Sequence, residues 1–244
     1  MSLCRKGFWD NPYLCRLNVS VIQVVGDEVM FDQTIAYSCS GGQESDSATF
    51  RGIPFVSSRI EGLNIWYTLA SGHGLSRGDS GLMEIDWPRR NRLMRYHMLC
   101  ELLLAIVNRY FGKLDRELEP KDIDNIGIVK VMAKMSESGA YVDFDHEDLR
   151  PYLPDIQAEL DKVISADLPI EKGFIDEKIH ERFWRIKRLA MIPCGGTHVK
   201  STGELGNAKL TRDRTTSKIT SSRKAERVKI KLVNDVPTSL GETL

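Results

Sequence analysis

The feature that most constrains the fold is an abrupt change of pattern at Asp86-Trp87-Pro88. Before it, short β-branched and aromatic runs alternate with glycines, which is typical of a small β-barrel or an open antiparallel sheet. After it comes a long run of helical period, introduced by an aspartate that can cap a helix and a proline suited to its first turn. The run ends at Gly112, and its apolar residues are predicted to share one side. The chain should therefore place a strand-rich part before a helix-bearing part.

The second part alternates between helices and strands. We predict a hairpin across residues 126–145, helices over 149–166 and 176–188, and strands at 189–193, 208–211 and 227–232. Helices beside an antiparallel sheet make an α+β domain. The predicted organisation is a β-barrel-like domain over residues 1–87, a two-layer α+β domain over residues 88–232 that contains the long helix, and a loose tail over residues 233–244.

Composition says little about partners, because the 244 residues include 34 basic and 34 acidic side chains. The distribution of charge says more. The segment from Lys200 to Lys231 is basic, which suits a polyanionic partner as well as it suits a solvated surface. Its basic residues are 200, 209, 212, 214, 218, 223, 224, 227, 229 and 231, and its acidic residues are 204, 213 and 226.

Cysteine usage and the lack of long apolar runs indicate a cytoplasmic protein. The five cysteines are scattered and odd in number, so no disulfide framework is expected. No signal peptide opens the chain, and no apolar run reaches the roughly 18 residues that cross a membrane. The sequence carries no signal for an oligomeric state.

Two pairs of side chains could together bind a metal ion. Cys194 and His198 stand four positions apart in PCGGTHVKSTGELG, where two glycines let the backbone turn tightly. His97 and Glu101 stand four apart on the long helix and so share a face. A thiolate with two imidazoles favours zinc over magnesium or calcium. The predicted ligand set is His97, Glu101, Cys194 and His198, although a core histidine, a surface carboxylate and a small buried thiol would explain the same residues.

Several motifs resemble those of a known family. PCGGTHVKSTGELG resembles the Cys-x-x-x-His motif of the alanyl-tRNA synthetase editing domain and of its freestanding, AlaX-type relatives. DWPRRNRLMRYHMLCELL resembles the family's helix with two histidines, and DQTIAYSCSGGQESD resembles its glycine-rich loop. Residues 223–232 resemble its closing strand, so the resemblance covers residues 15–232.

The resemblance implies a function. The family hydrolyses the ester that joins a wrong amino acid, typically serine or glycine, to the 3′ end of alanine tRNA, at a zinc site. It implies a metal-dependent aminoacyl-tRNA deacylase whose partner is the acceptor end of a mischarged tRNA. Thr34 and Gln43 of the loop would hydrogen-bond a substrate hydroxyl, which lets a site distinguish serine from alanine. Four arginines at the start of the long helix would contact phosphates: Arg89, Arg90, Arg92 and Arg95.

Two departures from the family pattern leave alternatives open. Glu101 replaces the second helix histidine, and it could be a zinc ligand, a general base beside three ligands, or the sign of a weak site. The loop from Ala36 to Gln43 has lost the family's phenylalanine, proline, glutamate and first glycine. The other functions compatible with these changes are a non-catalytic, zinc-stabilised tRNA-binding module and a hydrolase of another small aminoacyl ester.

Overall fold

The computed structural model describes residues 4–123, 130–213, 215, 224–233 and 241–243. The chain forms two compact units. Unit 1 consists of Met1–Arg92 with Ser239–Leu244, and unit 2 consists of Leu93–Thr238.

Unit 1 is a closed β-barrel of strands in the order β2-β3-β7-β6-β5-β8, with β8 pairing back onto β2. The strands are β2 (Leu14–Val25), β3 (Glu28–Phe31), β5 (Ala48–Phe50), β6 (Ile53–Glu61), β7 (Asn64–Leu69) and β8 (Ser80–Ile85). The long strand β2 closes the barrel because its two halves have different partners. Its first half pairs with β8 through Arg16 and Glu84, and its second half pairs with β3 through Val25 and Glu28.

The interior of the barrel is filled by side chains from every second position of its strands. Phe31, Phe50, Tyr67 and Met83 are at most 1% exposed and belong to one hydrophobic cluster. The Phe31 ring lies with its centroid 4.8 Å from that of Phe50. The alternation of apolar residues that predicted these strands is therefore the alternation between the inside and the outside of the barrel.

Short elements surround the barrel. Strand β1 (Arg5–Lys6) runs parallel to β4 (Gln33–Thr34), and helix α1 (Gly7–Asp10) follows β1. Strand β16 (Glu242–Thr243) pairs in parallel with β2. It lies in the segment 233–244, of which residues 234–240 and 244 are outside the described part of the chain.

Unit 2 contains two antiparallel sheets. One has the order β14-β15-β10-β9, built from β9 (Lys130–Ser136), β10 (Gly139–Phe144), β14 (Ala208–Asp213) and β15 (Glu226–Leu232). The other has the order β11-β12-β13, built from β11 (Glu171–Asp176), β12 (Glu181–Ile186) and β13 (Ala190–Pro193). The remaining elements are α3 (Pro120–Ile123), η1 (Arg150–Tyr152), α4 (Leu153–Ser165) and η2 (Thr202–Leu205).

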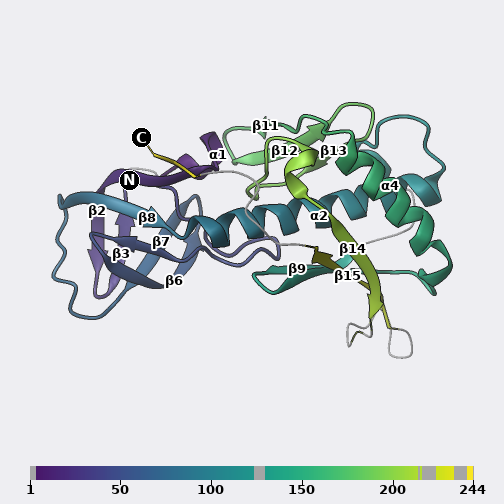
Figure 1. The fold of residues 1–244 in the computed structure, drawn as a ribbon. Helices are drawn as coiled ribbons and strands as arrows, with labels where there is room; N and C mark the ends of the chain where they lie inside the picture. Colours follow the sequence, from purple (N-terminus) through teal and green to yellow (C-terminus); the bar gives the residue numbers. More distant parts are fainter. Residues whose placement is uncertain (1–3, 124–129, 214, 216–223, 234–240, 244) are drawn as a thin grey trace. The chain divides into compact units, whose positions relative to one another are not determined.

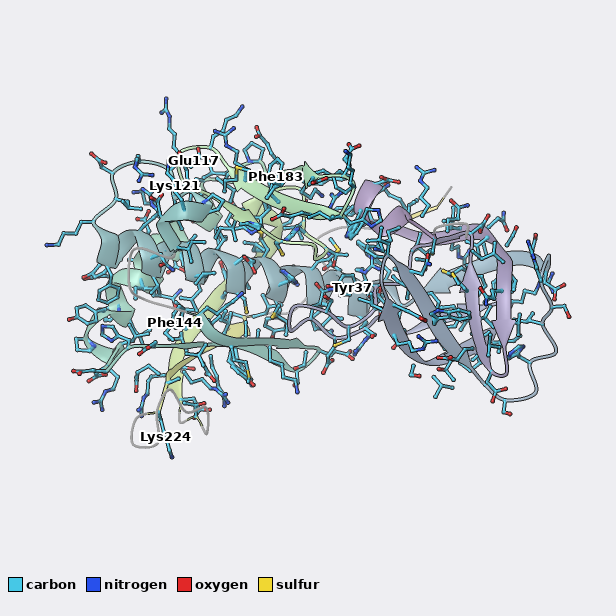
Figure 2. All side chains as sticks on the ribbon, turned by 180° about the vertical axis from the view of Figure 1, so that it is seen from behind. Tyr37, Glu117, Lys121, Phe144, Phe183 and Lys224 are labelled. Carbon is cyan, nitrogen blue, oxygen red and sulfur yellow. The ribbon has the colours of Figure 1, made fainter. Side chains whose placement is uncertain are left out.

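Helix α2 (Trp87–Gly112) runs between the two sheets of unit 2 (Figure 1). Figure 2 shows Phe183 of one sheet and Phe144 of the other on opposite sides of this helix. Every residue from Leu93 to Asn108 is buried, so the helix is enclosed all round rather than on the single side predicted. A helix covered by two sheets needs apolar side chains on both faces, which explains the run Leu102–Val107.

The fold class is confirmed as α+β with a small N-terminal barrel. One predicted element is wrong, because residues 176–188 form no helix and instead contain β12. In β12, buried Arg182, Trp184 and Ile186 alternate with the less buried Phe183 and Arg185, which is the period of a strand. Among the described residues, no helix is both long and apolar enough to cross a membrane.

Candidate metal centre

The loop that carries Cys194 and His198 is fixed at both ends. Cys194 directly follows β13, and its backbone N–H donates to the Arg182 carbonyl at 2.8 Å, extending the pairing with β12. Downstream, the Thr202 hydroxyl donates to the Val163 carbonyl at 2.7 Å and accepts from the Leu168 N–H at 2.8 Å. The loop from Cys194 to Thr202 is thus tied to a sheet at its start and to helix α4 at its end.

Three of the four predicted ligands come together in unit 2. The ligand atoms of His97, Cys194 and His198 all lie within 4.8 Å of one another. His97 Nε2 is 3.1 Å from Cys194 Sγ. The two imidazole rings have centroids 4.9 Å apart and stand nearly perpendicular, at 86°. Helix α2 and the loop after β13 therefore direct one thiol and two imidazoles at a common point.

His198 contributes a buried nitrogen that is suited to binding a ligand. Its Nε2 atom is buried and has no hydrogen-bond partner among the described residues. A buried polar nitrogen without a partner costs about 1–3 kcal/mol. A metal ion would complete its coordination and remove that cost.

Gly196 brings the loop close to the helix. A Cβ atom at position 196 would lie 2.2 Å from Cε1 of His97, a distance too short for any side chain to be accommodated. At Gly195, the preceding residue, an added Cβ would meet nothing within 4 Å. The second glycine of PCGG therefore serves the approach to His97, whereas the first does not limit packing.

Burial sets the protonation of the three side chains. Burial lowers the pKa of His97 to about 3 and lowers the pKa of His198 well below its usual value. Burial also raises the pKa of the Cys194 thiol, with a further contribution from the Glu101 carboxylate. Both imidazoles are thus neutral and able to coordinate, and a thiolate here needs a nearby cation. The donor set and its electrostatics fit zinc.

Glu101 lies at the edge of this group and not within it. Its Oε1 is 3.8 Å from His97 Nε2, while its Oε2 accepts a hydrogen bond from the Trp184 indole N–H at 3.2 Å. Burial raises the pKa of the Glu101 carboxyl. The carboxylate is therefore fixed by β12 on one oxygen and presents the other toward the histidine.

The predicted substrate residues Thr34 and Gln43 belong to unit 1, and both are 0% exposed. The Thr34 hydroxyl accepts from the Ala36 N–H at 3.0 Å and lies 2.8 Å from the Tyr67 hydroxyl, which donates to the Ala36 carbonyl at 2.6 Å. Gln43 closes a turn with Ser40 through two backbone hydrogen bonds. In this structure both residues hold the shape of the loop from Ile35 to Asp46.

Two of the arginines predicted to contact phosphate are buried within the fold. Arg90 is 0% exposed, and in unit 1 its guanidinium pairs with Asp46 and donates to the carbonyls of Ile35 and Pro12. Arg95 is 1% exposed and donates to the Leu205 carbonyl at 3.0 Å in unit 2. The prediction was wrong for both because each arginine finds its partners within the fold.

The sequence did not point to Trp184 as part of the site. Its side chain is 0% exposed, and its contact with Glu101 joins residues 83 positions apart. The available signal was the period-2 pattern of residues 182–186, which turns Trp184 inward once β12 is recognised as a strand.

Comparison with known proteins shows similarity to alanyl-tRNA editing proteins. Residues 182–228 match the family described as "Threonyl and Alanyl tRNA synthetase second additional domain". The chain is 28% identical to the alanyl-tRNA editing protein AlaX-M of Pyrococcus horikoshii, over 86% of this chain and 91% of that protein. It is 27% identical to AlaX-M of Methanosarcina barkeri, over 81% of this chain and 88% of that protein.

The chain is also similar to much longer proteins. It is 27% identical to the alanine–tRNA ligase of Staphylothermus marinus, over 84% of this chain but only 24% of the ligase. These likenesses confirm the resemblance to alanyl-tRNA editing proteins that the PCGGTHVKSTGELG motif indicates.

Proposed function

We propose that this chain hydrolyses the ester of mischarged alanine tRNA, acting in trans on tRNA that carries serine or glycine. The observation that carries the proposal is the convergence of His97, Cys194 and His198. Its support from relatives is that two alanyl-tRNA editing proteins match the chain over most of their own length.

We propose that these three side chains hold zinc, with the orphaned Nε2 of His198 as one donor. Zinc bound there would supply a Lewis acid beside the substrate ester. The neutral imidazoles are ready to coordinate, and the thiolate of Cys194 offsets part of the charge of the ion. The ligand loop is held at its start by the bond from the Cys194 N–H to Arg182 and downstream by Thr202, so the site needs little reorganisation to load.

We assign Glu101 the role of general base beside a three-ligand centre. Trp184 holds one of its oxygens, and the other faces the ligand group at 3.8 Å from His97. In this role Glu101 takes a proton from the attacking water as the new bond to the carbonyl carbon forms. When the ester C–O bond breaks, the same carboxyl returns the proton to the ribose oxygen of the leaving tRNA, so the products are the free amino acid and uncharged tRNA.

Thr34 and Gln43 are proposed to act on substrate choice through the loop that they shape. The Thr34 hydroxyl is engaged within unit 1, so a direct contact with the substrate would require it to exchange partners. The backbone of Gln43 is bonded to that of Ser40, which fixes the turn of the loop. A Thr34→Val variant would loosen Ala36 and is expected to change the ratio of serine to alanine release more than the rate itself.

The test is deacylation of alanine tRNA charged with serine, glycine or alanine. We expect release of serine or glycine but not of alanine, and loss of at least about 100-fold in rate for Cys194→Ala and His97→Ala. Binding of tRNA without release of any amino acid would replace the proposal with a zinc-stabilised tRNA-binding module. Release only from other small aminoacyl esters would change the substrate class.

Glu101→Gln separates the two roles of that residue. If Glu101 is the base, the Glu101→Gln variant should keep its zinc content, and its rate should fall by about 100-fold or more. As a fourth ligand, the same change would lower zinc affinity. Glu181→Gln, a change of an exposed glutamate in β12, is the matched control.

A further inference from the structure

The four-stranded sheet of unit 2 turns one face toward helix α2 and the other toward solvent. The inward positions are apolar and buried: Met135, Ala140, Val142, Val228 and Ile230. The alternate positions are mostly polar: they carry lysines and one tyrosine, together with Arg227 and the acidic Asp143 and Asp213. Of these, Lys134, Lys209 and Lys231 are exposed, and Tyr141 and Lys229 are half-buried.

The strand register sets these side chains in two adjacent rows. Tyr141 of β10 lies between Lys134 of β9 and Lys229 of β15. One pleat away, Lys231 of β15 lies opposite Lys209 of β14. Cβ atoms directly opposite each other in a sheet are about 5 Å apart. Lys209 and Lys231 are therefore neighbours, whereas Tyr141 separates Lys134 from Lys229.

The face is hollowed where the lysines meet the hairpin of β9 and β10. A groove of about 370 Å³ is lined by Lys134, Lys229 and Lys231, with hydroxyls from Ser136 and Ser138. Gly139 lies opposite Ser136 and contributes no side chain, which keeps the end of the groove open. The lining thus combines positive charge with hydroxyl groups.

The positive charge of this face is only partly neutralised within the fold. The Arg227 guanidinium donates two hydrogen bonds to the Asp143 carboxylate, at 2.7 and 2.8 Å, and Asp213 forms an ion pair with Lys229. No ion pair is recorded for Lys134, Lys209 or Lys231 with any residue that the structure describes. Three lysines therefore remain to attract an anion.

The lysine side chains favour a ligand bound through its negative charge and not through base stacking. The Arg227 guanidinium lies 3.6 Å from the centroid of the Tyr141 ring, so it covers the aromatic face that a base would use. Lysines and serines bind phosphate oxygens regardless of sequence. The repeat of lysines along the sheet suits a chain of phosphates better than a single one.

We propose that this lysine face, defined as Lys134, Lys209, Lys229 and Lys231, binds the phosphodiester backbone of the tRNA substrate. The proposal rests on the proposed function for the identity of the RNA. It extends the basic segment seen in the sequence to Lys134 and to the groove of β9 and β10, and it assigns no role there to Arg90 or Arg95.

The test is binding of an alanine tRNA transcript to the full chain in 50–200 mM KCl. The variant Lys134→Glu/Lys209→Glu/Lys231→Glu is expected to bind at least about tenfold more weakly at the lowest salt concentration. Each lost phosphate contact lowers the slope of log Kd against log salt by about 0.9, so the slope should fall by about two to three. Within the part of the chain that the structure describes, none of the three lysines has an ion pair to lose, so the variant should fold.

The control reverses three exposed lysines elsewhere in unit 2, Lys162, Lys178 and Lys187, which changes the net charge equally. Lys162 and Lys187 lose only exposed ion pairs, which contribute about 0–1 kcal/mol each. Equal affinity and equal salt slope in both variants would overturn the proposal. The seryl ester of a CCA trinucleotide separates this proposal from the proposed function, because cleavage of so short a substrate does not need the lysine face. If the unmodified chain cleaves no ester, the proposed function fails. A weaker tRNA affinity of the triple lysine variant would still support binding of RNA at the lysine face.

Discussion

Gly196 and His97 approach each other more closely than any side chain at position 196 would allow. The geometry of the ligand group thus depends on the absence of a side chain at Gly196 as well as on the thiol and the imidazoles. Gly195 is its natural comparison, since neither glycine has a positive φ and only position 196 is crowded.

We predict that Gly196→Ala weakens zinc binding by at least about tenfold, because the new methyl group must displace the His97 ring or the loop. Gly195→Ala should bind zinc as the unmodified chain does. Titration against a competing chelator measures both affinities. Equal zinc affinity in the two variants would show that the approach of Gly196 to His97 does not matter for the site.

The protonation states at the centre predict a pH dependence. The lowered pKa values of His97 and His198 leave both rings neutral at pH 6–8, while the raised pKa of Cys194 leaves its thiol protonated. Zinc binding must then release the proton of the Cys194 thiol, which is bound only in the metal-free state. Affinity should therefore rise with pH, by about tenfold per unit, and fall as the pH is lowered.

Zinc titrations at pH 6, 7 and 8 check this slope. Glu101→Gln should retain this slope, because the released proton comes from the Cys194 thiol and not from Glu101. Cys194→Ser should flatten it. A slope near three would mean that the histidines also release protons, and a slope of zero would mean that the thiol takes no part.

At the scale of elements, strand β14 is an edge strand whose free side is closed by a helix. Gln157 of α4 accepts from the Leu210 N–H at 2.7 Å and donates to the Ala208 carbonyl at 3.0 Å. One side-chain amide thus replaces the two hydrogen bonds that a neighbouring strand would make. This contact joins α4 to the sheet that carries the lysine face.

We predict that Gln157→Ala destabilises unit 2 by about 1–3 kcal/mol, because it leaves two backbone groups without their partner. Glu159→Ala on the same helix loses only an exposed pair with Lys162 and should cost about 0.5 kcal/mol or less. Urea unfolding of the two variants measures the difference. Equal midpoints would show that water satisfies β14 as well as Gln157 does.

At the scale of the whole molecule, the sequence predicted the features that local pattern controls. The barrel strands, the start of α2 at the Asp-Trp-Pro turn and the pairing of Cys194 with His198 all follow from spacings within a few residues. The convergence of the ligands was predicted by combining ligand chemistry with family resemblance, and the structure brings His97, Cys194 and His198 together.

What the sequence could not supply depends on distant partners. Ile175, Ile179, Phe183 and Ile186 fit a helical spacing, and only pairing with β11 and β13 makes residues 181–186 a strand. The burial of Arg90 depends on Asp46, 44 positions away, and the fixation of Glu101 depends on Trp184. No local pattern carries such contacts.

The most direct measurement is the metal content and first coordination shell of the purified chain, from elemental analysis and X-ray absorption at the zinc edge. The account predicts about one zinc per chain, with one sulfur and two imidazole nitrogens among its ligands. Cys194→Ser should remove the sulfur signal. A chain that retains no zinc after incubation with the metal, or that binds it without sulfur, would contradict the account.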